Sequence, residues 1–257
     1  HIMNELLKMT AHQVKEGKFD KAILAIGSCE AHGQHLAEGC DTIVSYELSK
    51  QVADRVPGML VLPPITVGYS GHYDTFPFTL TFDYETMIHV IYDIVESVLR
   101  NGINKIFLMN GHDGNIAPIE IAARKIKEKY PDARIASLPE WWVIAGKLVP
   151  EGTFAVWNGL GHAGEGESSI AYHLFPQWCE PDQATCVVPD HLPEHVDIKW
   201  DFAEITDTAQ TGDATVATAA KGKLMNDCLV EAVVKDIEAL EKTGWNYNTS
   251  HCATKLK

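Results

Sequence analysis

Acidic and imidazole side chains are concentrated in the segment GSCEAHGQHLAEGCD, residues 27–41. Glu30 and His32 flank a single residue, as two ligands that converge on one point from an extended backbone would. Asp41 lies where a helical pattern begins, a position at which an aspartate can also serve simply as an N-cap. Carboxylates and imidazoles are common ligands of divalent metal ions. The segment is therefore a candidate metal site that the rest of the chain must support.

Two further segments carry side chains of the same kind at loop-to-helix junctions. The segment NGHDGN contains His112 and Asp113, and the segment GHAGEGES contains His162, Glu165 and Glu167. Acidic residues near a helix start are stabilised by the helix dipole. This effect explains a glutamate in the segment GHAGEGES but not the Gly-His pair before it. Both segments therefore remain candidates for catalytic or metal-binding residues.

The combination of ligand types indicates which ions would bind. Histidines mixed with carboxylates suit Zn²⁺, Mn²⁺ or Fe²⁺ better than Ca²⁺. The carboxylates exceed the needs of one tetrahedral ion, so we expect two divalent ions that share a bridging carboxylate, with Asp41 as the best candidate. Such a pair lowers the pKa of a shared water and polarises a carbonyl. The predicted chemistry is hydrolysis.

Strand and helix patterns alternate along the chain and must position these loops. Apolar runs predict strands, and apolar residues at helical spacing predict helices. The predicted strands cover residues 21–26, 60–62, 105–110 and 134–138, and the clearest predicted helices cover residues 42–55, 84–101, 116–129 and 214–242. Repeated strand–helix units predict an α/β fold with a mostly parallel sheet. Because loops after parallel strands share one edge of the sheet, Glu30, His32 and His112 can meet there.

Aromatic residues in irregular segments are candidates for substrate contacts. Tyr73 lies in a loop rich in aromatic and polar residues, and Trp141 and Trp157 lie in a section with no clear periodicity. Tryptophans in such places can instead cover the core or a subunit contact. His191 and His195 lie in a polar segment and are expected to be solvent-exposed loop residues rather than ligands.

Composition excludes several classes of function. The 257 residues carry a formal net charge of −14, and clustered Lys and Arg, which nucleic-acid binding requires, are absent. No apolar run reaches the length of about 18 residues that a membrane span needs, and no signal peptide opens the chain. The six cysteines form no CxxC pair and are expected to be reduced. We therefore expect a cytoplasmic protein with a small-molecule substrate, no nucleic acid and no membrane partner.

Five motifs, in order, resemble those of the creatininase (creatinine amidohydrolase) family. EAHGQHLAEGCD resembles E-x-H-G-x-H-L-P-x-G-T-D, and NGHDGN and HAGEGESS resemble N-G-H-G-G-N and H-A-G-x-x-E-T-S. FPFTL is similar to F-P-G-T-L, and GDATVATAAKG to G-D-P-x-x-A-T-x-E-K-G. Together the motifs span most of the chain.

The resemblance implies a three-layer α/β/α fold, a two-metal hydrolytic centre and a homohexamer. It implies a single domain over residues 4–245, and the position of residues 246–257 at the end of the chain separately predicts a loose tail. Matching positions imply that Glu30, His112 and Asp41 hold one ion, and that His32, Asp41 and a further carboxylate hold the other.

The further carboxylate and the catalytic histidine are also implied by position. In creatininase the carboxylate is a Glu where this chain has Gly114, so Glu167 is the simplest replacement, with Asp113 and Glu165 as weaker candidates. His162 matches the catalytic histidine that gives a proton to the leaving group after the metal-bridging hydroxide attacks the carbonyl.

Departures from the family motifs bear on the substrate. Gly114, Asp113 and Phe78 replace residues typical of creatininase, which puts creatinine itself in doubt. The loop around Tyr73 has no basic residue, so we favour a small uncharged cyclic substrate with a carbonyl, namely a cyclic amide. The alternatives are C–C bond hydrolysis of an oxidised inositol diketone, deformylation of a nucleotide precursor, or a metal-dependent isomerase or lyase reaction on a keto-sugar. Metal binding without catalysis is the remaining alternative.

Overall fold

A parallel sheet forms the centre of the computed structural model, which describes residues 3–190 and 193–246. Within these residues the main sheet has the order β2-β1-β3-β4, with all pairs parallel. The strands are β1 (Lys21–Ile26), β2 (Met59–Val61), β3 (Lys105–Asn110) and β4 (Arg134–Leu138). The four predicted strands are therefore confirmed, with β2 shifted by one residue.

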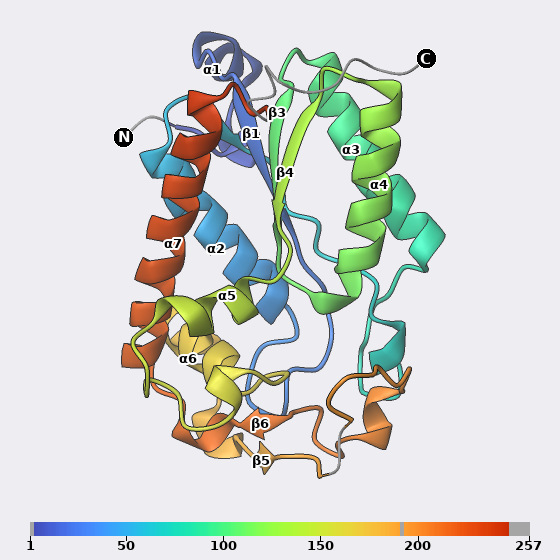
Figure 1. The fold of residues 1–257 in the computed structure, drawn as a ribbon, viewed down its shortest axis with the longest axis vertical. Helices are drawn as coiled ribbons and strands as arrows, with labels where there is room; N and C mark the ends of the chain where they lie inside the picture. Colours follow the sequence, from blue (N-terminus) through green and yellow to red (C-terminus); the bar gives the residue numbers. More distant parts are fainter. Residues whose placement is uncertain (1–2, 191–192, 247–257) are drawn as a thin grey trace.

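Helices cover both faces of this sheet (Figure 1). One face packs against α3 (Tyr84–Arg100) and α4 (Ile116–Lys129), and the other against α2 (Cys40–Arg55), α5 (Trp141–Leu148), α6 (Glu165–Leu174) and α7 (Ala219–Lys242). The short helix α1 (Ala11–Glu16) precedes β1. Side chains of β1 alternate between the two cores, since Leu24 belongs to one and Ile23 to the other. The three-layer α/β/α architecture is confirmed.

Several smaller elements were not predicted, and one predicted helix is shorter than expected. Helix α5 lies in the section predicted to be irregular. Helix α7, predicted to begin at residue 214, begins five residues later, after a 3-10 turn and the N-cap Thr218. A second sheet pairs β5 (Cys186–Val187) with β6 (Gly212–Asp213) antiparallel. Short 3-10 turns lie at Leu6–Lys8, Gly71–Tyr73, Asp113–Asn115, Trp157–Gly159, Pro176–Trp178, Pro181–Gln183, Phe202–Glu204 and Ala214–Val216.

Some predictions concern segments that the structure leaves out. The expected tail lies outside the described residues except for residue 246, and so does His191. His195 is exposed, as predicted. Among the helices of the described chain, none has both the length and the apolar character of a membrane span.

The pairing of β1 with β3 is what positions the site. The two strands run in register from Lys21 opposite Lys105 to Ile26 opposite Asn110. They therefore end side by side, and the loops that carry Glu30 and His112 leave the sheet at the same edge.

Candidate metal centre

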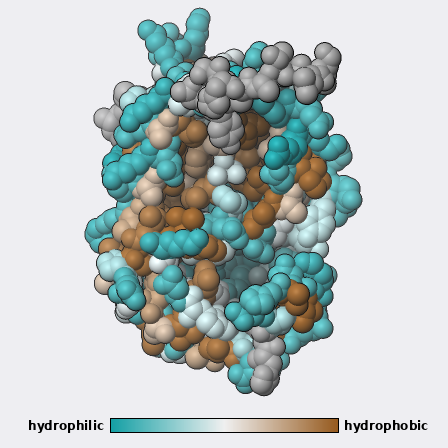
Figure 2. Space-filling view, in the orientation of Figure 1, coloured by the Kyte–Doolittle hydropathy of each residue, from teal (hydrophilic) through white to brown (hydrophobic). Residues whose placement is uncertain are grey.

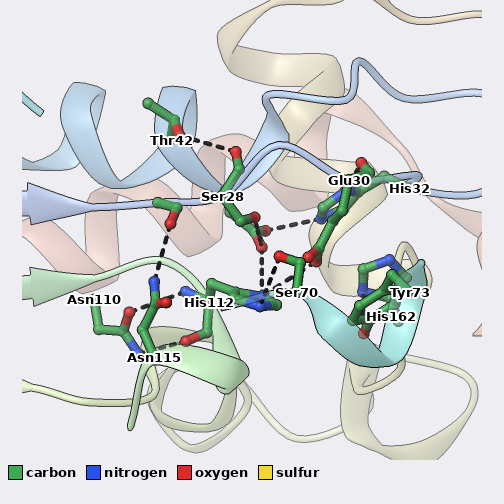
Figure 3. Close-up of polar contacts among 12 residues, drawn as sticks. Ser28, Glu30, His32, Thr42, Ser70, Tyr73, Asn110, His112, Asn115 and His162 are labelled. Atoms are coloured by element: carbon green, nitrogen blue, oxygen red, sulfur yellow. Dashed lines mark hydrogen bonds and ion pairs between the residues drawn. The ribbon is translucent and has the colours of Figure 1, made fainter. Parts of the chain in front are cut away.

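Glu30, His32 and His112 converge at the carboxyl edge of the sheet (Figure 3), and Asp41 contacts both histidines there. All four side chains are almost completely buried. A close approach of two backbones makes this possible: a Cβ at Gly111 would lie 2.3 Å from the carbonyl oxygen of Asp41. Only glycine lets the loop after β3 pass so close to the start of α2, and this contact places His112 beside Asp41.

Asp41 contacts both histidines rather than capping its helix. The N-cap of α2 is Gly39, and Asp41 lies in the first turn. Its Oδ1 is 2.8 Å from His32 Nε2, and its Oδ2 is 3.1 Å from His112 Nδ1 and accepts a hydrogen bond from Ser28 Oγ at 2.8 Å. The N-cap interpretation is therefore wrong, and the carboxylate lies between two potential metal ligands.

The carboxylate of Glu30 is buried without a hydrogen bond. Neither of its oxygens has a hydrogen-bond partner among the described residues, and His112 Nδ1 lies 3.1 Å from one of them. Leaving a buried carboxylate in this state costs free energy unless a cation is present. Donor atoms of Glu30, Asp41 and His112 lie within 4.8 Å of one another, as do those of His32, Cys40 and Asp41 and those of Glu30, His32 and His162. These donors fit divalent metal ions.

The three carboxylates considered as the last ligand lie in different places. Glu167 Oε1 is 3.9 Å from His32 Nε2, and its other oxygen accepts the Ala163 N–H at 2.6 Å. Glu165 is also buried, but its carboxylate is bound to Lys221 Nζ at 2.6 Å, and neither glutamate belongs to the three donor groups given above. Asp113 is exposed at the edge of the cavity described below. Of these, Glu167 is the carboxylate placed beside the histidines.

Gly114 has no room for the glutamate that creatininase carries at this position. A Cβ there would lie 2.2 Å from the Tyr69 carbonyl oxygen and 2.6 Å from His112 Nε2. The same carbonyl oxygen lies 2.7 Å from His112 Nε2. The space beside Gly114 is thus occupied by the Tyr69 carbonyl and the His112 ring. A further carboxylate ligand would have to come from another segment of the chain.

Protons balance the buried carboxylates when no metal is bound. Burial lowers the pKa of His32, but the charge of Asp41 and its hydrogen bond outweigh this and raise the pKa to about 10. Burial also lowers the pKa of His112. The charges of Glu30 and Asp41 outweigh this effect and hold the pKa well above its usual range. For Glu167, burial reinforced by the charge of Asp41 raises the pKa to about 8. The imidazoles therefore carry positive charge at the place where a bound cation would supply it.

His162 lies beside this cluster as a neutral imidazole. Its ring centroid is 4.3 Å from that of His32. Burial, reinforced by the charge of His32, holds the pKa of His162 well below its usual range. Its Nε2 is 2.6 Å from the Ala31 carbonyl oxygen, and its Nδ1 is 3.1 Å from the Tyr73 hydroxyl oxygen. Since a carbonyl only accepts, Nε2 carries the proton and Nδ1 accepts from Tyr73.

The backbone before α6 explains why Gly161 precedes His162, which the helix dipole does not explain. Gly161 has a φ of +119°, and a Cβ there would lie 2.4 Å from the Thr211 carbonyl oxygen. Thr211 Oγ1 in turn accepts the His162 N–H at 2.9 Å. Glycine is thus required for the chain to approach Thr211, and this approach directs the His162 ring toward the site.

A family model described as creatinine amidohydrolase matches residues 7–237. This chain belongs to the creatininase family. Among curated relatives, a creatinine amidohydrolase of Pseudomonas putida is 28% identical over 230 residues, which cover 84% of this chain and 87% of the relative. A mycofactocin precursor peptide peptidase of Mycobacterium ulcerans is 25% identical over 243 residues, covering 89% and 90%.

Solved creatininase-family structures share the fold. A protein of Bacteroides fragilis assigned as a creatinine amidohydrolase has a TM-score of 0.82 at 25% identity, covering 93% of this chain and 97% of that one. A manganese creatininase has a TM-score of 0.76 at 26% identity, covering 92% and 98%, and a variant of Zn-Zn type has a TM-score of 0.76 at 27% identity, covering 91% and 97%. Members of this family thus bind Mn or Zn.

The creatininase-family site opens into a cavity of about 310 Å³. Its lining includes Asp41, His112, His162 and Glu167 together with Tyr73. Figure 2 shows a recess in this face of the molecule at the level of the loops that follow the strands. A larger cavity of about 560 Å³ lies elsewhere, between β2 and α3, and is lined mainly by aliphatic side chains. We place the site in the smaller cavity because the candidate ligands line it.

The tryptophans that line the cavity are not the ones considered from the sequence. Trp141 is completely buried in the core and Trp157 is 39% exposed, and neither lines the cavity. Trp142, Trp200 and Phe202 do line it. The last two come from the segment interpreted as polar loop, and the alternation of aromatic and charged residues in KWDFAE was the available signal.

Substitution of the two neighbouring tryptophans is expected to separate stability from binding. Trp141→Ala would empty a fully buried site and lower the free energy of unfolding by about 3–5 kcal/mol. Trp142→Ala, at a half-buried position on the cavity wall, is expected to cost much less stability but to raise KM. Chemical denaturation and steady-state kinetics on both variants check this, and equal losses of stability would contradict it.

Proposed function

We propose that this creatininase-family chain is a dinuclear metal-dependent hydrolase that cleaves an amide bond in a small cyclic substrate. The observation that carries the proposal is the position of Asp41. One of its oxygens lies 2.8 Å from His32 Nε2 and the other 3.1 Å from His112 Nδ1, so a single carboxylate reaches two separate groups of ligands.

The proposed ligands divide into two sets that share Asp41. Glu30, His112 and Asp41 would hold one ion, and His32, Asp41 and Glu167 the other. The unbonded Glu30 carboxylate supports the first set, and the approach of Glu167 to His32 supports the second. We propose Mn, Zn or Fe as the ions. When bound, they would polarise the substrate carbonyl and lower the pKa of a water molecule.

His162 is proposed as the group that takes a proton from the attacking water at Nδ1 and passes it to the leaving nitrogen. Its Nδ1 accepts from the Tyr73 hydroxyl, and both side chains line the cavity. Its other nitrogen is held by the Ala31 carbonyl, so the ring cannot turn without losing that hydrogen bond. Tyr73 and Ala31 thus fix the imidazole in one orientation and one tautomer, as general acid–base catalysis requires.

The size of the cavity favours a small substrate. A volume of about 310 Å³ lies at the lower end of the range of small-molecule sites, roughly 300–1,000 Å³. Amide cleavage is supported by the relatives, since both a creatinine amidohydrolase and a peptide peptidase are named for hydrolysing C–N bonds. A short peptide is therefore the second candidate substrate.

The test is turnover by enzyme loaded with Mn²⁺ or Zn²⁺, in water enriched in ¹⁸O. The panel contains creatinine, a hydantoin, a formamide, a short peptide and a freshly oxidised inositol diketone. Ring opening of creatinine or the hydantoin with label in the new carboxylate is the expected result. Label only in the diketone product would replace the proposal with C–C hydrolysis. Conversion without label would replace it with isomerase or lyase chemistry.

Assembly is proposed from the family resemblance, and location from the sequence. We propose a cytoplasmic homohexamer, and light scattering coupled to size-exclusion chromatography would give the mass of the particle in solution. A mass close to one chain would contradict the hexamer without affecting the proposed chemistry.

A further inference from the structure

One carboxylate in the cavity has no partner in the structure. Asp113 directly follows His112 and begins the 3-10 turn Asp113–Asn115. Its side chain is exposed and lines the cavity, and within residues 3–190 and 193–246 it makes no hydrogen bond or ion pair. Aspartate in an Asp-Gly turn commonly bonds its own backbone, but this side chain makes no such bond. A role in forming the turn therefore does not account for it.

Apart from the proposed metal ligands, Asp113 is the only charged side chain among the described residues that line the cavity. The other carboxylates of the cavity, Asp41 and Glu167, are proposed metal ligands and contact neighbouring groups. Among the described residues that line it there is no lysine or arginine. A negatively charged substituent near Asp113 would be repelled by that carboxylate, and no lysine or arginine of the lining would offset the repulsion. The lining therefore disfavours anionic substrates, and the free carboxylate distinguishes a neutral substituent from a positively charged one.

Aromatic rings supply a large part of the cavity wall, beside Val143, Leu160 and Thr211. Tyr73, Trp142, Trp200 and Phe202 line it. Trp200 and Phe202 lie 5.2 Å apart between ring centroids, and Phe202 and Tyr73 lie 4.7 Å apart. Aromatic faces attract cations, tryptophan most strongly. Aromatic rings and an unpaired carboxylate in one cavity can bind an ammonium or amidinium group through cation–π contacts and an ion pair.

We infer that this cavity selects substrates that carry a positively charged nitrogen group close to the scissile carbonyl, with Asp113 as the residue that determines this preference. The inference rests on the proposed function and narrows its substrate class. Because Asp113 is adjacent in sequence to the proposed ligand His112, the charged group would lie near the reacting carbonyl and not at a distant subsite. The expectation of an uncharged substrate, which rested on a loop without basic residues, is revised accordingly.

Binding is tested first, with two probes of the same shape. The cyclic guanidinium 2-aminoimidazoline and the neutral cyclic urea imidazolidin-2-one are titrated into metal-loaded protein by calorimetry. Asp113→Asn is expected to weaken binding of the guanidinium by about two- to fivefold, the loss of one exposed ion pair, because the aromatic rings and their cation–π contact remain. The same substitution is expected to leave the urea unchanged. Asp132→Asn, at an exposed turn between α4 and β4, removes the same charge elsewhere and should change neither.

Hydrolysis is tested with hydantoins that differ only in one substituent. The wild type is expected to give a kcat/KM about tenfold higher for 5-(aminomethyl)hydantoin than for 5-(hydroxymethyl)hydantoin. In Asp113→Asn the two values should approach each other, while Asp132→Asn keeps the preference. Hydrolysis without preference, or a preference that survives Asp113→Asn, would overturn the inference.

The two experiments separate failure of the inference from failure of the proposed function. If no hydantoin is hydrolysed but Asp113→Asn still weakens only the guanidinium, the proposed reaction is wrong and the charge preference stands. If both probes bind equally to the wild type and to Asp113→Asn, the inference is wrong whatever the enzyme hydrolyses.

Discussion

Asp41→Ala is expected to reduce the metal content from the proposed two ions per chain to one or none and to lower kcat/KM on the order of 10³-fold or more. The physical reason is that Asp41 reaches both His32 and His112, so that its removal takes one ligand from each proposed ion. Metal content measured by mass spectrometry after dialysis, together with turnover of the best substrate from the panel, checks this.

The control for this prediction must separate metal loss from unfolding. Asp41 is buried and accepts from Ser28, so the substitution will also cost stability. Asp41→Asn keeps the shape and removes the charge, and Glu47→Gln removes a carboxylate from the same helix away from the site. A folded Asp41→Ala variant with two ions and wild-type turnover would disprove the bridging role.

His162→Ala is expected to keep the metal content and to lower kcat by roughly 10²–10⁴-fold, the range for loss of a general acid or base. His162 Nε2 is bound to the Ala31 carbonyl and its Nδ1 to Tyr73, so its contacts are those of an oriented catalytic group. Metal analysis and single-turnover kinetics on the purified variant give the two quantities separately.

The alternative for His162 is a role as a metal ligand. Its donor atoms lie within 4.8 Å of those of Glu30 and His32. Loss of one ion in His162→Ala would therefore assign it to the metal, while normal kcat would remove it from the mechanism. His195→Ala, at an exposed loop position, serves as the matched control.

The proposed reaction and the charge preference make different demands on the same cavity. The ligands are buried at its base and Asp113 is exposed at its edge. A substitution at Asp113 can therefore change substrate choice without removing a ligand. This separation allows members of one family to retain a common centre while they differ in substrate.

The order and type of the main elements could be predicted from the sequence alone. The strands β1 and β3 are continuous apolar runs because both of their faces are buried, and this pattern is local in the sequence. The candidate ligand types could also be predicted, since glutamate and histidine follow these strands in loops that must share one edge of the sheet. The short apolar helix α5 was not predicted, because nothing local distinguishes its eight residues from an irregular aromatic segment.

Only the tertiary structure decided which of several equivalent residues occupy the site. Trp141 and Trp142 are adjacent in sequence, and the phase of α5 directs the first into the core and the second to the cavity. Glu165 and Glu167 are distinguished by Lys221, which comes from another helix and binds the first of them. Asp41 could be a helix cap or a candidate ligand until the start of α2 and the position of His112 were known, and these place it in the first turn of the helix beside a histidine. Residue type is a local property of the sequence. Which residues contact one another depends on segments far apart in the sequence, and only the packing of the folded chain brings these segments together.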